Sequence, residues 1–186
     1  MAYDSEVGLT KVILAQPGVL AATAVGCVVL GFLALLAALL FGWNKLPAVL
    51  AACGLSLALA VTLVRGDFTN ATPHLVNPLS VCLRNSFSLK GSWELLNFVM
   101  LMPVGFFGVL ATRRPILVAL GCALVSAAIE VSQAVFELGV CEKQDFLNNS
   151  VGAAVAALAG WLLLALFGGR RTDRARRATS SYSLAR

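Results

Sequence analysis

Acidic and amide side chains are concentrated in residues 127–156, a segment whose two ends are apolar enough to enter a lipid bilayer. The polar members of this segment are Glu130, Gln133, Glu137, Glu142, Asp145, Asn148 and Asn149. Carboxyl groups can exchange protons with a substrate, and amides can both donate and accept hydrogen bonds. Residues of these types near a membrane surface indicate binding of, or reaction with, the polar part of an amphipathic molecule.

The spacing of the polar residues places several of them on shared helix faces. Glu130, Gln133 and Glu137 recur at i, i+3 and i+7, and Glu94 lies one helical turn from Asn97. A carboxylate in or near hydrocarbon is costly unless it is protonated, paired, hydrogen-bonded or next to water. We therefore expect Glu130 to have hydrogen-bonding partners, with Asn97 and Gln133 as natural amide partners across the helices.

The elements that hold these residues are membrane spans. The chain is 59% hydrophobic and 12% charged, with a mean hydropathy of +0.87. About 20 apolar residues in a helix cross the hydrocarbon core. Apolar stretches of this kind occupy residues 19–41, 46–64, 93–110, 115–138 and 146–167. Because a helix satisfies its own backbone hydrogen bonds in lipid, we predict an all-α, multi-pass bundle of about five spans.

Basic residues predict the orientation of the bundle, since Lys and Arg near span ends remain on the cytoplasmic side. They occur at Lys45, Arg113, Arg114, Arg170, Arg171, Arg174, Arg176 and Arg177, whereas Asp4 and Glu6 precede the first span. We thus predict an extracytoplasmic segment at 1–18, the bundle at 19–168 and a basic, disordered cytoplasmic tail at 169–186. This topology places seven polar residues near the outer leaflet: Glu94, Asn97, Glu130, Gln133, Asp145, Asn148 and Asn149.

Two local patterns bear on helix packing. Pro103 and Gly105 are expected to kink the third span, because proline lacks an N–H and clashes with the preceding turn. In the fifth span, Gly152, Ala156 and Gly160 recur at intervals of four and form a stripe of small residues that allows close helix contact. We expect this stripe to pack within the monomer rather than between two copies.

The loops and the tail restrict the classes of site. Cys82 and Cys141 both fall in predicted outer loops, so we predict a disulfide between them. The lone His74 has no ligand-spaced partner, and we expect neither a metal site nor a cofactor. Nucleic-acid binding is not expected, because no base-stacking aromatics are interleaved in the basic tail.

Three motifs follow one another along the second half of the chain. They are an Asn-x5-Pro-x-Gly motif (Asn97, Pro103, Gly105), a Glu-x-x-Gln motif (Glu130, Gln133) and an Asp-x3-Asn-x2-Gly-Ala motif (Asp145, Asn149, Gly152). In this order they resemble the VanZ-like family of bacterial membrane proteins. The resemblance covers residues 93–166. It implies a location in the bacterial plasma membrane, and the family's namesake is associated with resistance to lipoglycopeptide antibiotics of the teicoplanin type.

The chain departs from the family pattern in one segment. Where members often carry an arginine, this chain has Gly139, and Glu142 and Gln144 stand near the expected acids. The resemblance therefore does not supply an arginine at this position to bind an anionic head group. Substitutes for it are available at Arg84, Lys90 and Lys143.

Several functions fit this pattern. The favoured one is an outer cleft that binds a membrane lipid, a lipid-linked cell-wall precursor or a lipoglycopeptide, with ligand contacts from Glu94, Asn97, Glu130, Gln133, Asp145 and Asn149. An enzyme with Glu130 as acid and Asp145 as base or orienter is an alternative, against which the missing nucleophile and metal count. A lipid transporter is disfavoured, since the polar residues are confined to the outer half. The same residues would also serve as plain interhelical hydrogen bonds.

Overall fold

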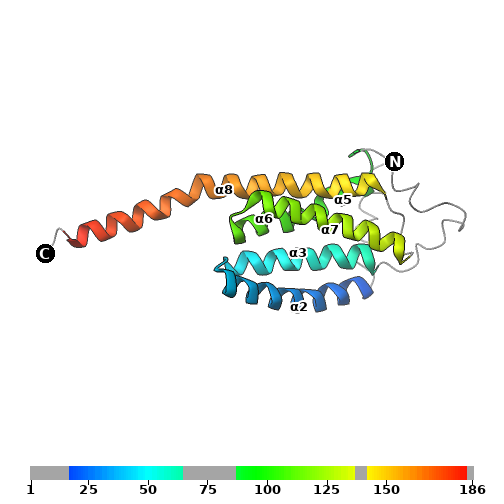
Figure 1. Cartoon of the computed structure of the whole chain (residues 1–186), viewed down its shortest axis with the longest axis horizontal. Coiled ribbons are helices and arrows are strands. Elements are labelled where there is room, and N and C mark those ends of the chain that lie inside the picture. The colour runs from blue at the N-terminus through cyan, green and yellow to red at the C-terminus, as the bar shows by residue number, and fades with distance from the viewer. Residues whose placement is uncertain (1–16, 65–86, 137–141, 184–186) are drawn as a thin grey trace, which may run out of the picture.

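The computed structural model describes residues 17–64, 87–136 and 142–183. Every regular element in these residues is an α-helix, as predicted (Figure 1). The helices are α2 (Pro17–Phe41), α3 (Lys45–Leu63), α5 (Ser92–Met100), α6 (Met102–Thr112), α7 (Pro115–Val135) and α8 (Lys143–Ser183).

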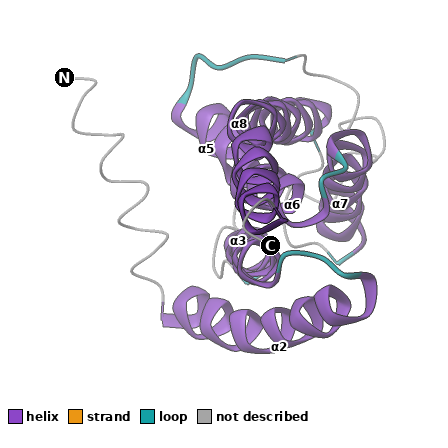
Figure 2. Ribbon diagram, turned by 90° about the vertical axis from the view of Figure 1, so that its left-hand side faces the viewer, coloured by secondary structure: helices purple, strands orange, loops and turns teal. Residues whose placement is uncertain are grey.

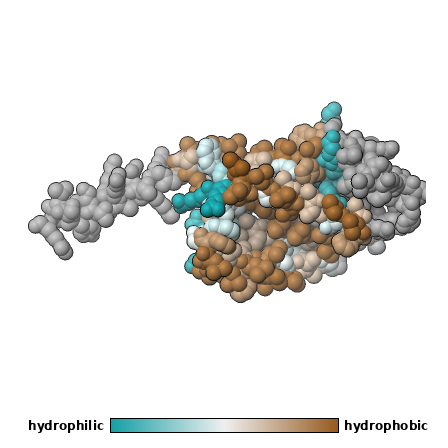
Figure 3. Space-filling model, viewed as in Figure 1, coloured by the Kyte–Doolittle hydropathy of each residue, from teal (hydrophilic) through white to brown (hydrophobic). Residues whose placement is uncertain are grey.

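The prediction of five membrane spans is confirmed by length and composition. The five helical segments that are long and apolar enough to cross a bilayer are Gly18–Phe41, Lys45–Leu63, Ser92–Thr112, Pro115–Val135 and Lys143–Phe167. On the face seen in Figure 3, hydrophobic residues cover the middle of the bundle and hydrophilic residues gather toward its two ends. This banding is the surface that a bilayer requires, with apolar side chains at the depth of the hydrocarbon.

The third span is broken rather than smoothly kinked. Helix α5 ends at Met100 and α6 begins at Met102, with Leu101 between them at φ −93° and ψ 0°. Pro103 then occupies the first turn of α6, where its missing N–H costs no intrahelical hydrogen bond. Gly105 is helical and has a different role from the one predicted, because a Cβ at this position would collide with the backbone oxygen of Ala153 on α8.

Helix α8 is the central packing partner of the second half of the chain, in contact with α5, α6 and α7 (Figures 1 and 2). Gly152 lies directly against the Phe98 carbonyl, and a Cβ at Gly160 would lie 2.9 Å from the oxygen of Phe106. Ala156, between them in the stripe, is also buried. The small-residue stripe therefore packs inside the monomer, as expected.

Helix α2 lies at the edge of the bundle, with α3 between it and the other helices (Figure 2). Ser56 of α3 donates a hydrogen bond of 2.9 Å to the Thr23 carbonyl of α2. The close approach that allows this bond requires a small residue at Gly26, because a Cβ there would overlap the Ser56 hydroxyl. Most of α2 is exposed, which leaves its apolar side chains facing lipid.

The bundle has two chemically distinct ends. At the end named here the basic end, α3 begins at Lys45 and the turn between α6 and α7 carries Arg113 and Arg114. The Asn44 side chain joins these turns by donating a hydrogen bond of 2.8 Å to the Leu110 carbonyl. The opposite end, where α7 terminates and α8 begins, is named the polar end.

Helix α8 extends past the bundle at the basic end and runs to Ser183 (Figure 1). It therefore includes most of the tail for which the sequence predicts disorder. The tail contains Arg and Ala residues, which have high intrinsic helix propensity, and it follows directly from a formed helix that needs no new nucleus.

Candidate functional site

The last turns of α7 present one buried polar face at the polar end of the bundle. Ser126, Glu130 and Gln133 follow one another at i, i+4 and i+7, and their side chains are 0%, 5% and 6% exposed. Val131 and Val135, on the other faces of the same turns, are 59% and 66% exposed. The polar face of α7 thus points into the protein and its apolar faces point toward lipid. Glu137 lies outside the described residues.

Glu130 is hydrogen-bonded, as expected for a buried carboxylate. Its Oε2 accepts a hydrogen bond of 2.9 Å from the backbone N–H of Glu142, just before α8 begins. The acids Glu142 and Asp145 are close enough to interact electrostatically with it. Three acids from the two sides of the α7–α8 connection therefore share one site. Asp145 lies in the first turn of α8, where the helix dipole favours a negative charge.

Gln133 connects the site to α3. Its Nε2 donates a hydrogen bond of 3.4 Å to the Thr62 backbone carbonyl. The amides of Asn97 and Gln133 were expected to bond Glu130, but the hydrogen bond that Glu130 accepts comes from the Glu142 backbone, and the Gln133 amide reaches α3 instead. Asn97 itself is half-buried on α5. The Thr62 carbonyl is available because it lies in the last turn of α3, where carbonyls have no N–H partner within the helix.

Asn148 ties the start of α8 to the start of α5. It is fully buried, and its Nδ2 donates to the carbonyls of Ser88 at 2.9 Å and Glu94 at 3.2 Å. Sequence reasoning did not include it among the ligand-binding candidates. A spacing pattern in the sequence could have identified Asn148. Its neighbours on one face of α8 recur at i, i+3, i+4 and i+7, as Asp145, Asn148, Asn149 and Gly152.

Glu94 contributes to the site chiefly through its backbone. Its carbonyl accepts the hydrogen bond from Asn148, whereas its carboxylate folds back beside Gly91 at the start of its own helix. A Cβ at Gly91 would overlap that carboxylate. The Glu94 side chain therefore lies at the N-terminus of α5, where the helix dipole stabilises it.

Two amide oxygens of the site are buried acceptors. Asn148 and Asn149 are 0% and 1% exposed, and the Oδ1 atoms of both lack a hydrogen-bond partner within the described part of the chain. A buried carbonyl oxygen is stabilised by any donor that reaches it. Together with the carboxylates of Glu130 and Asp145, these oxygens give the polar end a strong preference for groups that donate hydrogen bonds.

The site is built from Glu130, Gln133, Glu142, Asp145, Asn148 and Asn149, named here the polar cluster. Within the described ranges, no group of three or more His, Cys, Asp and Glu side chains has the geometry of a metal site. Two hollows among the described residues, one beside Arg113 and Trp161 and one between α2 and α3, lie away from the polar cluster. Cys82, Cys141 and His74 lie outside the described residues, and the described cysteines Cys27, Cys53 and Cys122 are free thiols.

Comparison with known proteins places this site within a family. The sequence model of the VanZ/LLP1 family matches residues 61–167, from the end of α3 to the end of the apolar part of α8. This range contains every residue of the polar cluster, all of α5, α6 and α7, and the end of α3 that accepts the hydrogen bond from Gln133. No curated protein and no solved structure matches the chain significantly.

Proposed function

This chain belongs to the VanZ/LLP1 family, and on that premise we propose that it protects bacterial cells against lipoglycopeptide antibiotics of the teicoplanin type. The protein acts in the plasma membrane by binding an amphipathic molecule at the polar end of its bundle. The bound molecule is the antibiotic itself or the lipid-linked cell-wall precursor that the antibiotic recognises. In either case the ligand combines an apolar tail with a polar head rich in hydrogen-bond donors.

The observation that carries this proposal is the burial of the polar cluster within a protein that faces lipid. Glu130, Asn148 and Asn149 are each at most 5% exposed at the end of two apolar helices. The adjacent faces of α7, with Val131 and Val135 exposed, offer apolar surface at the same depth for a tail. A molecule lying in the outer leaflet would rest its tail on these apolar faces, and its polar head would have to enter the end of the bundle to reach the buried cluster.

The hydrogen bonds of the cluster suggest a division of roles. Gln133 and Asn148 donate to backbone carbonyls on neighbouring helices, so we assign them to holding the bundle together. Glu130, Asp145 and Asn149 present acceptor oxygens, and we assign them to the ligand. Glu94 and Asn97 are half-buried on α5, and we assign them to the path by which the ligand reaches these residues.

The orientation follows from the charges at the two ends. Lys45, Arg113 and Arg114 all lie at the basic end, and basic residues stay on the cytoplasmic side. The polar end then faces outward, where cell-wall precursors are used and where these antibiotics act.

Binding to the purified protein in lipid nanodiscs tests the proposal. Teicoplanin and a lipid-linked cell-wall precursor are measured separately. We expect at least one of them to bind wild type, and to bind Glu130→Gln about tenfold more weakly. This is the size expected for losing a hydrogen bond to a charged group. Gly121→Ala is the matched control, because nothing lies within 4 Å of a Cβ at that position. Equal binding of both ligands by wild type and Glu130→Gln would refute the assignment.

A membrane enzyme is the second candidate, and the pairing of two unlike carboxyl environments favours it. Glu130 is buried whereas Asp145 is half-buried, and the two interact electrostatically. Carboxyl pairs in different environments can divide the roles of acid and base. The test is mass spectrometry of a lipid-linked precursor after incubation with purified protein. A new product that is formed by wild type but by neither Glu130→Gln nor Asp145→Asn would show that the protein is an enzyme rather than a binding protein.

A further inference from the structure

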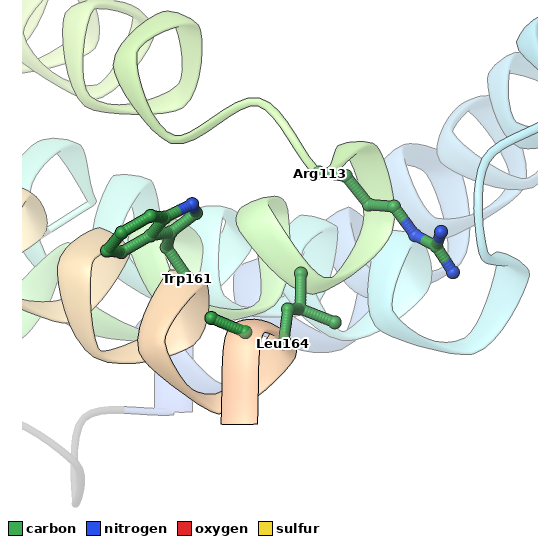
Figure 4. A pocket seen from close by; sticks show the side chains of 4 residues that line it. Arg113, Trp161 and Leu164 are labelled. Atoms are coloured by element: carbon green, nitrogen blue, oxygen red, sulfur yellow. The ribbon is translucent and has the colours of Figure 1, made fainter. Parts of the chain in front are cut away.

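A hollow at the basic end, remote from the polar cluster, has features of a ligand site. It has a volume of about 320 Å³ and is lined by Arg113, Trp161, Leu164 and Ala165. The three residues from α8 recur at i, i+3 and i+4 and therefore lie on one face of that helix. Arg113 comes from the turn between α6 and α7, so the hollow, named here the Arg113 hollow, lies where that turn meets α8 (Figure 4).

Arg113 is held at the rim of this hollow by its backbone. It is the residue that ends α6, its N–H donates to the Val109 carbonyl at 2.8 Å, and its φ is 60°. Glycine is the residue usually found at such a left-handed helix end. The side chain is exposed, and Figure 4 shows its guanidinium directed away from the Trp161 indole. The aliphatic part of Arg113 thus borders the hollow while its charge remains available at the surface.

The charged residues near the hollow whose side chains are described carry one sign. Arg114 and Lys45 lie at the basic end with Arg113. Among residues 17–64, 87–136 and 142–167, the acids lie at the opposite end, at Glu94, Glu130, Glu142 and Asp145. An anion at the basic end would therefore be attracted by several cations and would meet little opposing charge from the bundle.

We propose that the Arg113 hollow binds an anionic phospholipid of the surrounding bilayer. The phosphate lies on the Arg113 guanidinium, and the upper part of an acyl chain packs on Trp161 and Leu164. Basic pockets between membrane helices on the cytoplasmic side suit anionic head groups, and tryptophan is enriched at the level of the head groups. The volume is at the small end of the range for ligand sites, so the hollow accommodates the part of the chain next to the head group rather than a whole lipid.

Fluorescence quenching of Trp161 tests this site directly. The full-length protein carries Trp43→Phe and Trp93→Phe, so that Trp161 is the remaining indole, and is placed in phosphatidylcholine nanodiscs. Brominated phosphatidylglycerol or brominated phosphatidylcholine is then added at equal mole fraction. We expect the anionic quencher to be preferred about fivefold, the effect of one well-placed basic residue. Equal quenching by the two lipids would overturn the proposal.

Paired variants separate a specific site from diffuse surface charge. Arg113→Gly removes the charge and keeps the turn, because glycine readily adopts a φ of 60°. Arg114→Gln removes one charge from the next residue, which does not line the hollow. We expect the preference to vanish in Arg113→Gly and to stay within twofold of wild type in Arg114→Gln. An equal loss in both variants would show that only the overall charge of this end matters.

A third variant tests the cavity with all charges in place. Ala165→Leu adds bulk to an exposed wall of the hollow and leaves the packed core of the bundle untouched. We expect it to weaken the preference for the anionic quencher at least threefold. An unchanged preference would mean that the lipid does not enter the hollow, and the proposal would fall. Because the polar cluster is at the other end, these results are independent of antibiotic binding.

Discussion

Glu130 and Asn148 meet the same difficulty, a polar side chain buried near a bilayer, in opposite ways. Asn148 donates to two backbone carbonyls and thereby joins α8 to the start of α5. Glu130 accepts one backbone N–H and interacts with two further acids. The first arrangement strengthens the bundle. The second concentrates like charges, which costs stability, and this is the pattern expected of a functional site rather than of a packing contact.

Replacing Asn148 with alanine should destabilise the protein by about 1–3 kcal/mol, because two buried carbonyl oxygens lose their donor. The measurement is equilibrium unfolding in detergent micelles. Val151→Ala, on an exposed position of the same helix, is the control and should change stability far less. Similar stability of Asn148→Ala and the control would remove the structural role of Asn148.

Replacing Glu130 with glutamine should leave the fold intact and keep or raise its melting temperature. The glutamine Oε1 can still accept the N–H of Glu142, and a neutral amide avoids the cost of burying a carboxylate near Asp145 and Glu142. Thermal unfolding of the variant beside wild type checks this. A clear fall in melting temperature would show that Glu130 is itself a stabilising element.

At the level of elements, α8 organises the bundle through small residues. Its glycines let the backbones of α5 and α6 approach closely, with Gly152 against Phe98 and Gly160 near Phe106. The spacing of four between these small residues and the interruption near Pro103 could both be predicted from the sequence. The partner of Gln133 could not be predicted, because its contact with Thr62 joins residues 71 apart and depends on which helices become neighbours. The helical tail was also missed, since a high content of charged residues resembles disorder.

Gly152→Ala should destabilise the bundle by about 1–3 kcal/mol, because its Cβ would overlap the backbone oxygen of Phe98, which cannot move without shifting α5. The measurement is thermal unfolding in detergent. Gly121→Ala provides a contrast, since its Cβ meets open space and the change should stabilise α7 by about 0.5–1 kcal/mol. If both variants had the same melting temperature, the close contact of α8 with α5 would not be important for stability.

At the scale of the whole molecule, the fold places two charged regions at opposite ends of the helical bundle. The polar cluster gathers acids at one end, and the turns at Lys45 and Arg113 gather cations at the other. Local helical periodicity predicted the faces, and the alternation of spans predicted which residues share an end. The sequence did not predict the hollow beside Trp161, because it forms only where the α6–α7 turn meets a helix distant in the chain.

This separation predicts a single orientation in the cell. With Cys82 and Cys141 replaced by serine, a cysteine at Lys90 should react with a membrane-impermeant maleimide in intact cells. A cysteine at Arg114 should react only after the cells are permeabilised. Both positions are exposed in the structure, so accessibility reports the side of the membrane rather than burial. The reverse pattern would place the polar cluster in the cytoplasm and exclude cell-wall precursors as its ligands.

The most direct measurement is growth of a sensitive host challenged with glycopeptide antibiotics that carry or lack a lipid tail. Cells express wild type, Glu130→Gln, Asp145→Asn or the Gly121→Ala control at matched membrane levels. We predict that wild type and the control protect against the tailed compound, and that the two polar-cluster variants fold normally but lose that protection. Full protection by both variants would contradict a functional role for the polar cluster and would leave its acids with only a structural role in the bundle.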